Sequence, residues 1–155
     1  MLPDPMRSVF CGYFAVLGVA LCLLSGATEM DYVGVSDCES CHQEQAKKWR
    51  DSPHAKATLT LGERATETAC RTCHATGLAP LGQSPLPGVQ CEACHGAGRG
   101  YRDEDIMRNP LLAEILGLVD LSSKEARKKL CLGCHQAGAK ITPFEVEAKW
   151  QEIAH

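Results

Sequence analysis

The hydrophobic and polar residues follow helical spacing in several short segments, and no segment of strand length alternates between the two. The clearest helical segment starts at Asn109-Pro110, after which five apolar residues would share one helix face: Leu111, Leu112, Ile115, Leu116 and Val119. A last helix is predicted over residues 145–154, after the break at Thr142-Pro143. The pattern therefore predicts a mostly α fold with short helices and long loops.

Capping residues and prolines predict the other helices of the N-terminal half. Asp37 is a candidate N-cap for a helix over residues 37–49, and Ser52-Pro53 restarts the chain as a helix over residues 53–61. Residues 63–74 predict a further helix.

Further along the chain, loops alternate with helices. Residues 75–89 are rich in glycine and proline and predict a loop, and Gly96 with the glycines after it would stop a helix. The capping box Ser122-Ser123-Lys124-Glu125 predicts a helix that continues through Leu130.

The first 27 residues have the pattern of a secretory signal peptide. Arg7 precedes an apolar run over residues 9–24, and Ser25-Gly26-Ala27 forms a cleavage site. The run is short for a membrane span, which needs roughly 20 apolar residues. We predict export to the periplasm and a single soluble domain over residues 28–155. The alternative is an uncleaved leader that associates with the membrane.

Cysteine spacing carries the strongest chemical signal in the chain. Of ten cysteines, Cys11 and Cys22 lie in the leader, and the other eight form four Cys-x-x-Cys-His motifs: Cys38-Glu39-Ser40-Cys41-His42, Cys70-Arg71-Thr72-Cys73-His74, Cys91-Glu92-Ala93-Cys94-His95 and Cys131-Leu132-Gly133-Cys134-His135. This pentapeptide is the attachment signature of a c-type haem. Two cysteines so spaced can both bind one porphyrin edge, and the adjacent histidine then ligates the iron.

Zinc is the alternative for paired cysteines. The stretch from Cys91 to Gly98 also fits the glycine-containing zinc repeat of the J-domain chaperones. The other three motifs lack these glycines, and a zinc knuckle does not require the histidine. Four covalently bound haem c groups, each with its iron, are therefore the predicted cofactors.

The supply of second iron ligands is limited. Beyond the motif histidines the chain contains only His54 and His155, which we predict as ligands, and Met107 is a candidate for a third haem. At least one iron is then expected to keep an open or water-occupied face. His54 follows His42 by twelve residues, which span about 18 Å of continuous helix. We therefore expect His54 to serve the haem of another motif.

Composition and charge agree with a haem protein. A chain of 155 residues with 5% aromatic residues forms only a marginal core from side chains, and four porphyrins would supply the missing apolar mass. The net charge is −3 without a long basic tract, which argues against nucleic acid as a partner. Redox proteins are the expected partners.

Three stretches resemble the tetrahaem cytochromes of the c-554 type: residues 38–54, residues 88–101 and residues 142–150. Members of this multihaem c-type cytochrome family accept electrons from hydroxylamine oxidoreductase or serve other respiratory chains. The resemblance implies a mostly α-helical protein with haems in close pairs. It implies a donor and an acceptor of the kind of a hydroxylamine-oxidoreductase-like enzyme or a membrane quinol-linked cytochrome.

The resemblance also implies a ligand set. His54 would ligate the fourth haem and His155 the third, while the second haem would lack a distal protein ligand. The family's first haem uses a histidine shortly after the third motif, where this chain has residues 102–109 without one. Met107 or a histidine of a neighbouring subunit would then replace it.

Electron transfer between respiratory redox partners is the predicted function, because iron saturated by two histidines suits transfer better than catalysis. No catalytic residue is predicted. One alternative is a reductase or oxidase of a small nitrogen compound, such as nitric oxide, nitrite or hydroxylamine, at an open haem. Another is a haem subunit of a larger assembly.

Overall fold

The computed structural model describes residues 32–77, 85–136 and 144–155, so the predicted signal peptide lies outside the described residues. The elements are, in chain order, α2 (Val35–Glu39), α3 (Gln43–Asp51), η1 (Pro53–Lys56), η2 (Leu59–Thr66), α4 (Thr68–His74), β1 (Ala75–Thr76), β2 (Leu86–Pro87), α5 (Cys91–His95), η3 (Gly98–Gly100), α6 (Glu104–Met107), α7 (Pro110–Ile115), α8 (Lys124–Leu132) and α9 (Val146–Ile153). The predicted mostly α fold with short helices is confirmed.

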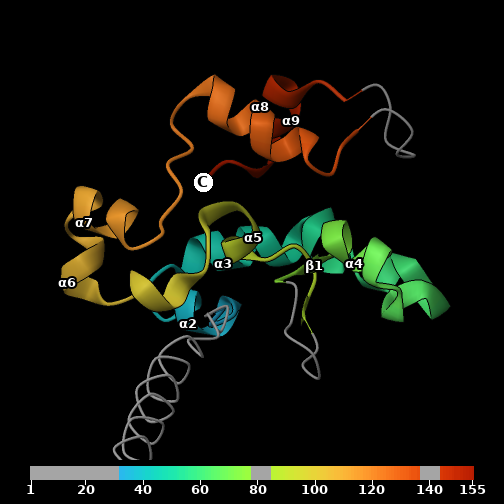
Figure 1. Cartoon of the computed structure of the whole chain (residues 1–155), viewed down its shortest axis with the longest axis horizontal. Helices are drawn as coiled ribbons and strands as arrows, with labels where there is room; N and C mark the ends of the chain where they lie inside the picture. The colour runs from blue at the N-terminus through green and yellow to red at the C-terminus, as the bar shows by residue number, and fades with distance from the viewer. Residues whose placement is uncertain (1–31, 78–84, 137–143) are drawn as a thin grey trace, which may run out of the picture.

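The helices form two layers and a lateral extension. In Figure 1, α2 to α5 make up the lower layer, α8 and α9 pack together above it, and α6 and α7 lie at one end. The C-terminus lies between the two layers, beneath α9. Within the described ranges, no helix is both long and apolar enough to cross a bilayer.

The first motif interrupts the helix that was predicted over residues 37–49. α2 ends at Glu39, and His42 has non-helical φ and ψ angles before α3 begins. The predicted cap at Asp37 is also wrong, because Gly34 takes the N-cap position. Asp37 instead pairs with Arg102, with 2.7 Å between the carboxylate and the guanidinium. Contacts with distant segments therefore outweigh local capping preference here.

The next helices are shorter than their sequence pattern suggested. Pro53 starts a helical turn as expected, but η1 is a 3-10 helix of four residues. The helix predicted over residues 63–74 is split into η2 and α4 at Glu67, whose ψ of 120° is extended. The predicted loop contains the two-residue strands β1 and β2, paired antiparallel, and residues 78–84 of it lie outside the described residues.

Three boundaries in the C-terminal half are confirmed by their caps. α5 ends at Gly96, whose φ of +82° favours glycine. Asn109 caps α7 through a bond from the Leu112 N–H, with proline at the first position. Ser123, one residue later than predicted, accepts from the Ala126 N–H and caps α8, which runs into the fourth motif.

The apolar stripe predicted on α7 does not face a core. Leu111 is 67% exposed and Ile115 is 70% exposed, whereas only Ala113 on this helix is buried. The helix is only six residues long, and the chain after it turns back to the third motif, where the Val119 N–H donates to the His95 carbonyl. The helical spacing of the apolar residues could not show that the chain turns back to the third motif.

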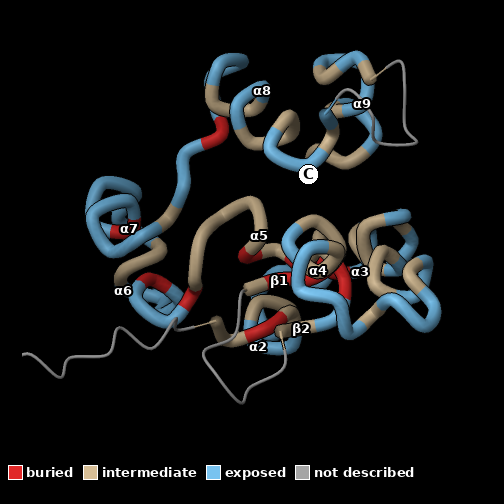
Figure 2. The backbone as a smooth tube through the Cα atoms, turned by 45° about the vertical axis from the view of Figure 1, so that its right-hand side comes forward, coloured by how far each residue is buried: buried red, intermediate tan, exposed pale blue. Residues whose placement is uncertain are grey.

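Few side chains are buried, as the scarcity of red in Figure 2 shows. Among the described residues, the buried hydrophobic ones are Ala46, Ala75, Tyr101, Ala113 and Leu121, and the largest fully buried side chain is Thr76. The two layers of helices therefore meet without a core of large aliphatic side chains. Such an interior suits a protein whose apolar mass is supplied by a cofactor.

A buried carboxylate holds the lower layer together. Glu92 lies inside the third motif, is 2% exposed, and accepts hydrogen bonds from the N–H groups of Val33, Gly34 and Gly98 at 2.7–2.8 Å. Its neighbour Gln90 accepts from the Val35 N–H at 2.8 Å. The start of α2, and with it the first motif, is thereby fixed to the third motif.

The substitution Glu92→Gln should destabilise the fold. An amide offers one acceptor oxygen where the carboxylate offers two, so at least one buried backbone N–H loses its partner, at a cost of about 1–3 kcal/mol. Urea unfolding of the holoprotein measures the difference. Glu114→Gln, on the exposed surface of α7, is the matched control and should change stability by less than about 0.5 kcal/mol. Equal midpoints for the two variants would contradict this role of Glu92.

Candidate functional site

The eight cysteines of the four motifs are all free. Cysteines of different motifs lie close enough for their thiols to interact: Cys38 with Cys91, Cys73 with Cys134, and Cys94 with Cys131. The interaction with Cys38 lowers the pKa of Cys91, and burial raises the pKa of Cys94 to about 11. The motifs are therefore neighbours in space in the order first, third, fourth, second.

His54 lies opposite the histidine of the fourth motif. The ring centroids of His54 and His135 are 6.1 Å apart, with 44° between the ring planes. Two imidazoles on opposite faces of one iron, each with a metal–nitrogen distance of about 2 Å, have centroids about 6 Å apart. The two rings are thus spaced as a pair of axial ligands.

The third motif has an equivalent pair. His95 and His155 have ring centroids 6.0 Å apart, with 59° between their planes. His95 ends α5, and His155 follows α9 from the opposite layer. Ligation by His54 and His155 remains a prediction, but these distances are what ligation requires.

The segments that carry these two histidines are fixed by contacts with distant residues. The His54 carbonyl accepts from the Val89 N–H at 2.9 Å, and the Trp49 indole N–H donates to the Val89 carbonyl at 2.6 Å. Gly88 permits this approach, because its φ is +79° and a Cβ atom would lie 2.9 Å from the Ala55 carbonyl oxygen. At the C-terminus, the Lys48 ammonium donates to the Ala154 carbonyl.

His74 of the second motif is held differently. Its Nδ1 lies 2.9 Å from the Ala57 carbonyl oxygen and 3.3 Å from the Thr60 hydroxyl. A bond from Nδ1–H to a carbonyl orients an imidazole so that Nε2 is free to bind metal. In the described part of the chain, neither His74 nor His42 has another histidine ring opposite it.

The local environment keeps three of the histidines neutral. Burial lowers the pKa of His54, with a further contribution from the charge of His135, and burial also lowers the pKa of His135. Burial lowers the pKa of His95 as well, helped by His155 and His42. A neutral imidazole is the form that ligates a metal, so no proton has to be displaced at neutral pH.

The arrangement fits haem and does not fit zinc. One cleft is lined in part by Cys91, Cys94, His95 and His155, so both cysteines of the third motif and the two opposed histidines border the same space. Arg71, inside the second motif, has a buried Nε–H without a protein acceptor among the described residues, which a haem propionate would satisfy. No cluster of three or more His, Cys, Asp or Glu side chains that could hold a metal ion occurs in the described ranges.

Short helices, cysteine pairs beside motif histidines and opposed imidazoles together define a c-type cytochrome. The family model of cytochrome c554 and c-prime matches residues 37–96, which include the first three motifs. Cytochrome c-554 of Nitrosomonas europaea is 30% identical over 187 residues of alignment, which cover 92% of this chain and 78% of that protein. No solved structure matches. The chain therefore belongs to the cytochrome c554 and c-prime family, and its cofactor is covalently bound haem c with iron.

Two kinds of residue at the site could not be found from the sequence. Glu92 carried no signal, because an acidic residue between two motif cysteines is expected to be exposed. Phe144 lies in one of the stretches that resemble the c-554 type cytochromes. Its ring stacks on His135 with a centroid distance of 4.1 Å, which the sequence did not indicate. Both act through contacts that no local sequence pattern encodes.

Replacing His54 or His155, the two histidines predicted as second ligands, should change the spin state of one iron each. His54→Ala should remove the low-spin signal of the fourth motif's haem, and His155→Ala that of the third, because no other histidine is available to replace them. EPR of the oxidised holoprotein measures the low-spin loss and the matching gain of high-spin iron. Lys56→Ala, an exposed position on η1, is the control. Unchanged low-spin intensity in both histidine variants would contradict the ligand pairs.

Proposed function

We propose that the protein is a periplasmic electron carrier that holds four haem c groups between a respiratory donor and acceptor. The proposal rests chiefly on the proximity of the four motifs to one another. Membership of the cytochrome c554 and c-prime family supports electron transport and haem. The number of haems and the partners are part of the proposal. Haem, when bound, supplies an iron that accepts and releases one electron.

The residues that hold these groups are those of the four motifs. The proximal ligands are the four motif histidines, His42, His74, His95 and His135. The thioether bonds are formed by the eight motif cysteines: Cys38, Cys41, Cys70, Cys73, Cys91, Cys94, Cys131 and Cys134. His54 and His155 complete the fourth and third sites. Imidazoles on both faces leave no position for a substrate, which favours a carrier over an enzyme at these two sites.

The electrostatic interactions between cysteines of different motifs support a transfer path through all four motifs. Cys38 interacts with Cys91, Cys94 with Cys131, and Cys134 with Cys73. Since each cysteine would be bonded to the edge of its own porphyrin, neighbouring thiols bring neighbouring edges together. The protein's contribution is to fix these edges: Glu92 joins the first motif to the third, and the packing of α8 against α9 joins the fourth to the third through His155.

A second candidate function follows from the histidine count. All six histidines are accounted for once His54 and His155 pair with motif histidines, so His42 and His74 have no histidine left to oppose them. An iron with an open face at either position would bind a small ligand, and reduction or oxidation of a small nitrogen compound is the alternative function. A neighbouring subunit that donates the missing ligand is the third interpretation.

Purified holoprotein should contain four haems per chain and show mostly low-spin iron. Mass spectrometry against the 16.7 kDa chain, with allowance for removal of the leader, counts the covalent haems. A redox titration followed by absorbance should resolve several one-electron steps, because the sites differ in their second ligand.

Nitric oxide distinguishes the two candidate functions. A carrier should bind little of it or bind it without turnover, whereas an enzyme should consume it when supplied with a reductant. Fewer than four haems, or zinc in place of iron, would contradict the proposed carrier.

A further inference from the structure

The ring of His135 is held by an aromatic stack. Phe144 lies parallel to it, with 2° between the planes and 4.1 Å between the centroids. The centroid of the His54 ring lies 6.1 Å from that of His135. Within the described residues, no hydrogen bond to a ring nitrogen of His135 is recorded. The imidazole plane is thus fixed by a flat apolar neighbour.

The second motif shows the usual arrangement for comparison. At His74 the Nδ1 atom is fixed by the Ala57 carbonyl, and this bond prevents the ring from turning about its Cβ–Cγ axis. His135 lacks such a bond within the described ranges. A stacked ring restricts the same rotation, because turning the imidazole would drive its edge into the face of Phe144.

Phe144 is itself held in place through helix α9, which follows it in the chain. It directly precedes Glu145, the N-cap of α9, and α9 is fixed to α8 by Arg127. The Arg127 guanidinium lies 5.3 Å from the Trp150 ring centroid and pairs with Glu147 at 3.3 Å. It also donates to the carbonyls of Leu121 and Ser122, so its side chain is only 13% exposed. The stack is therefore supported by a second set of contacts, those that fix α9 to α8.

We propose that Phe144 is a positioning residue, which sets the plane of the His135 imidazole and thereby the 44° angle between the two axial rings at the fourth motif. The proposal rests on the proposed function, in which His54 and His135 ligate one iron. The angle between two axial imidazoles determines how the iron d orbitals split, and the g values of low-spin iron report this splitting. The angle at the third motif, 59°, is set without Phe144.

EPR of the oxidised full-length holoprotein tests the proposal. In Phe144→Leu, the low-spin signal that His54→Ala abolishes should shift and broaden, because the imidazole is released to several orientations. Phe144→Tyr keeps the ring and should restore the wild-type signal. The signal that His155→Ala abolishes is an internal control in the same sample and should not move.

Each outcome decides a separate point. If Phe144→Leu leaves the fourth-motif signal at its wild-type g values and width, the positioning role is overturned while the ligand pair stands. If His54→Ala abolishes no low-spin signal, the ligand assignment beneath both proposals is overturned. Phe144→Met keeps apolar volume without a ring and replaces Phe144→Leu if that variant binds fewer haems. A wild-type signal in Phe144→Met overturns the role equally.

Discussion

Three backbone N–H groups converge on one buried carboxylate, and the relative positions of the haem-binding motifs depend on this contact. Glu92 belongs to the third motif, while Val33 and Gly34 lead into α2 and the first motif. A charged group that is nearly excluded from water is costly unless its oxygens are satisfied. Here the oxygens are satisfied by Gly98, six residues away, and by Val33 and Gly34 of a distant segment. Separation of that segment from the third motif would therefore remove two of the three donors.

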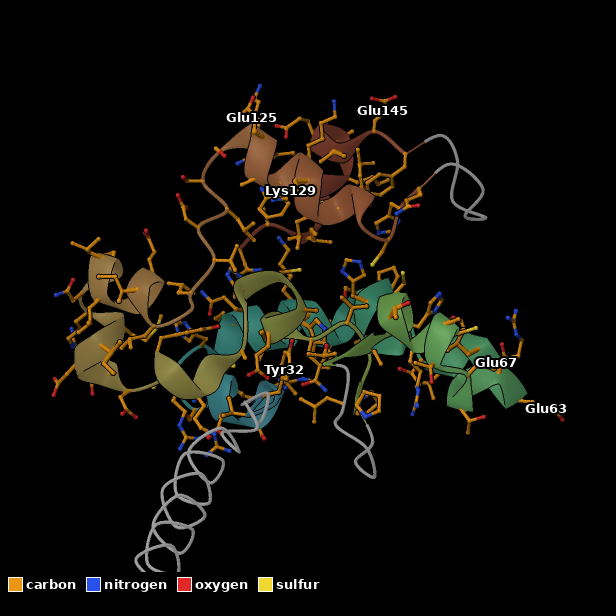
Figure 3. The ribbon with its side chains drawn as sticks, viewed as in Figure 1. Tyr32, Glu63, Glu67, Glu125, Lys129 and Glu145 are labelled. Carbon is orange, nitrogen blue, oxygen red and sulfur yellow. The ribbon has the colours of Figure 1, made fainter. Side chains whose placement is uncertain are left out.

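The rest of the interior follows the same principle of polar contacts in place of a large apolar core. Thr76 donates to the Gly88 carbonyl and accepts from the Gln90 N–H, and Thr58 accepts from the Gly88 N–H. These bonds join α4 and β1 to the third motif, next to the segment that carries His54. In Figure 3 side chains from the two layers extend into the space between them, with Lys129 on α8 in the upper layer. The polypeptide thus forms a frame held by polar contacts, with few large apolar side chains buried among the described residues.

The sequence predicted the fold class, the family and helix starts that depend on local chemistry, at Asn109 and, within one residue, at the start of α8. Local chemistry failed where a distant segment intervened. Asp37 was expected to cap a helix but pairs with Arg102, and the apolar residues predicted to share one helix face at α7 are largely exposed. The attachment motifs could be recognised from the sequence because covalent haem binding constrains residues that are close together in the chain. The spacing of His54 and His135, by contrast, arises from packing between the layers, and only the structure could measure it.

Helix α9 connects two of the proposed haem sites, since Phe144 precedes it and His155 follows it. One residue added to a helix turns everything beyond it by about 100° and moves it by about 1.5 Å. An insertion or deletion inside α9 would therefore carry His155 away from His95 while Phe144 stayed on His135. Relatives of this protein should accordingly tolerate changes of length between the fourth motif and Phe144 far better than within the eight residues of α9.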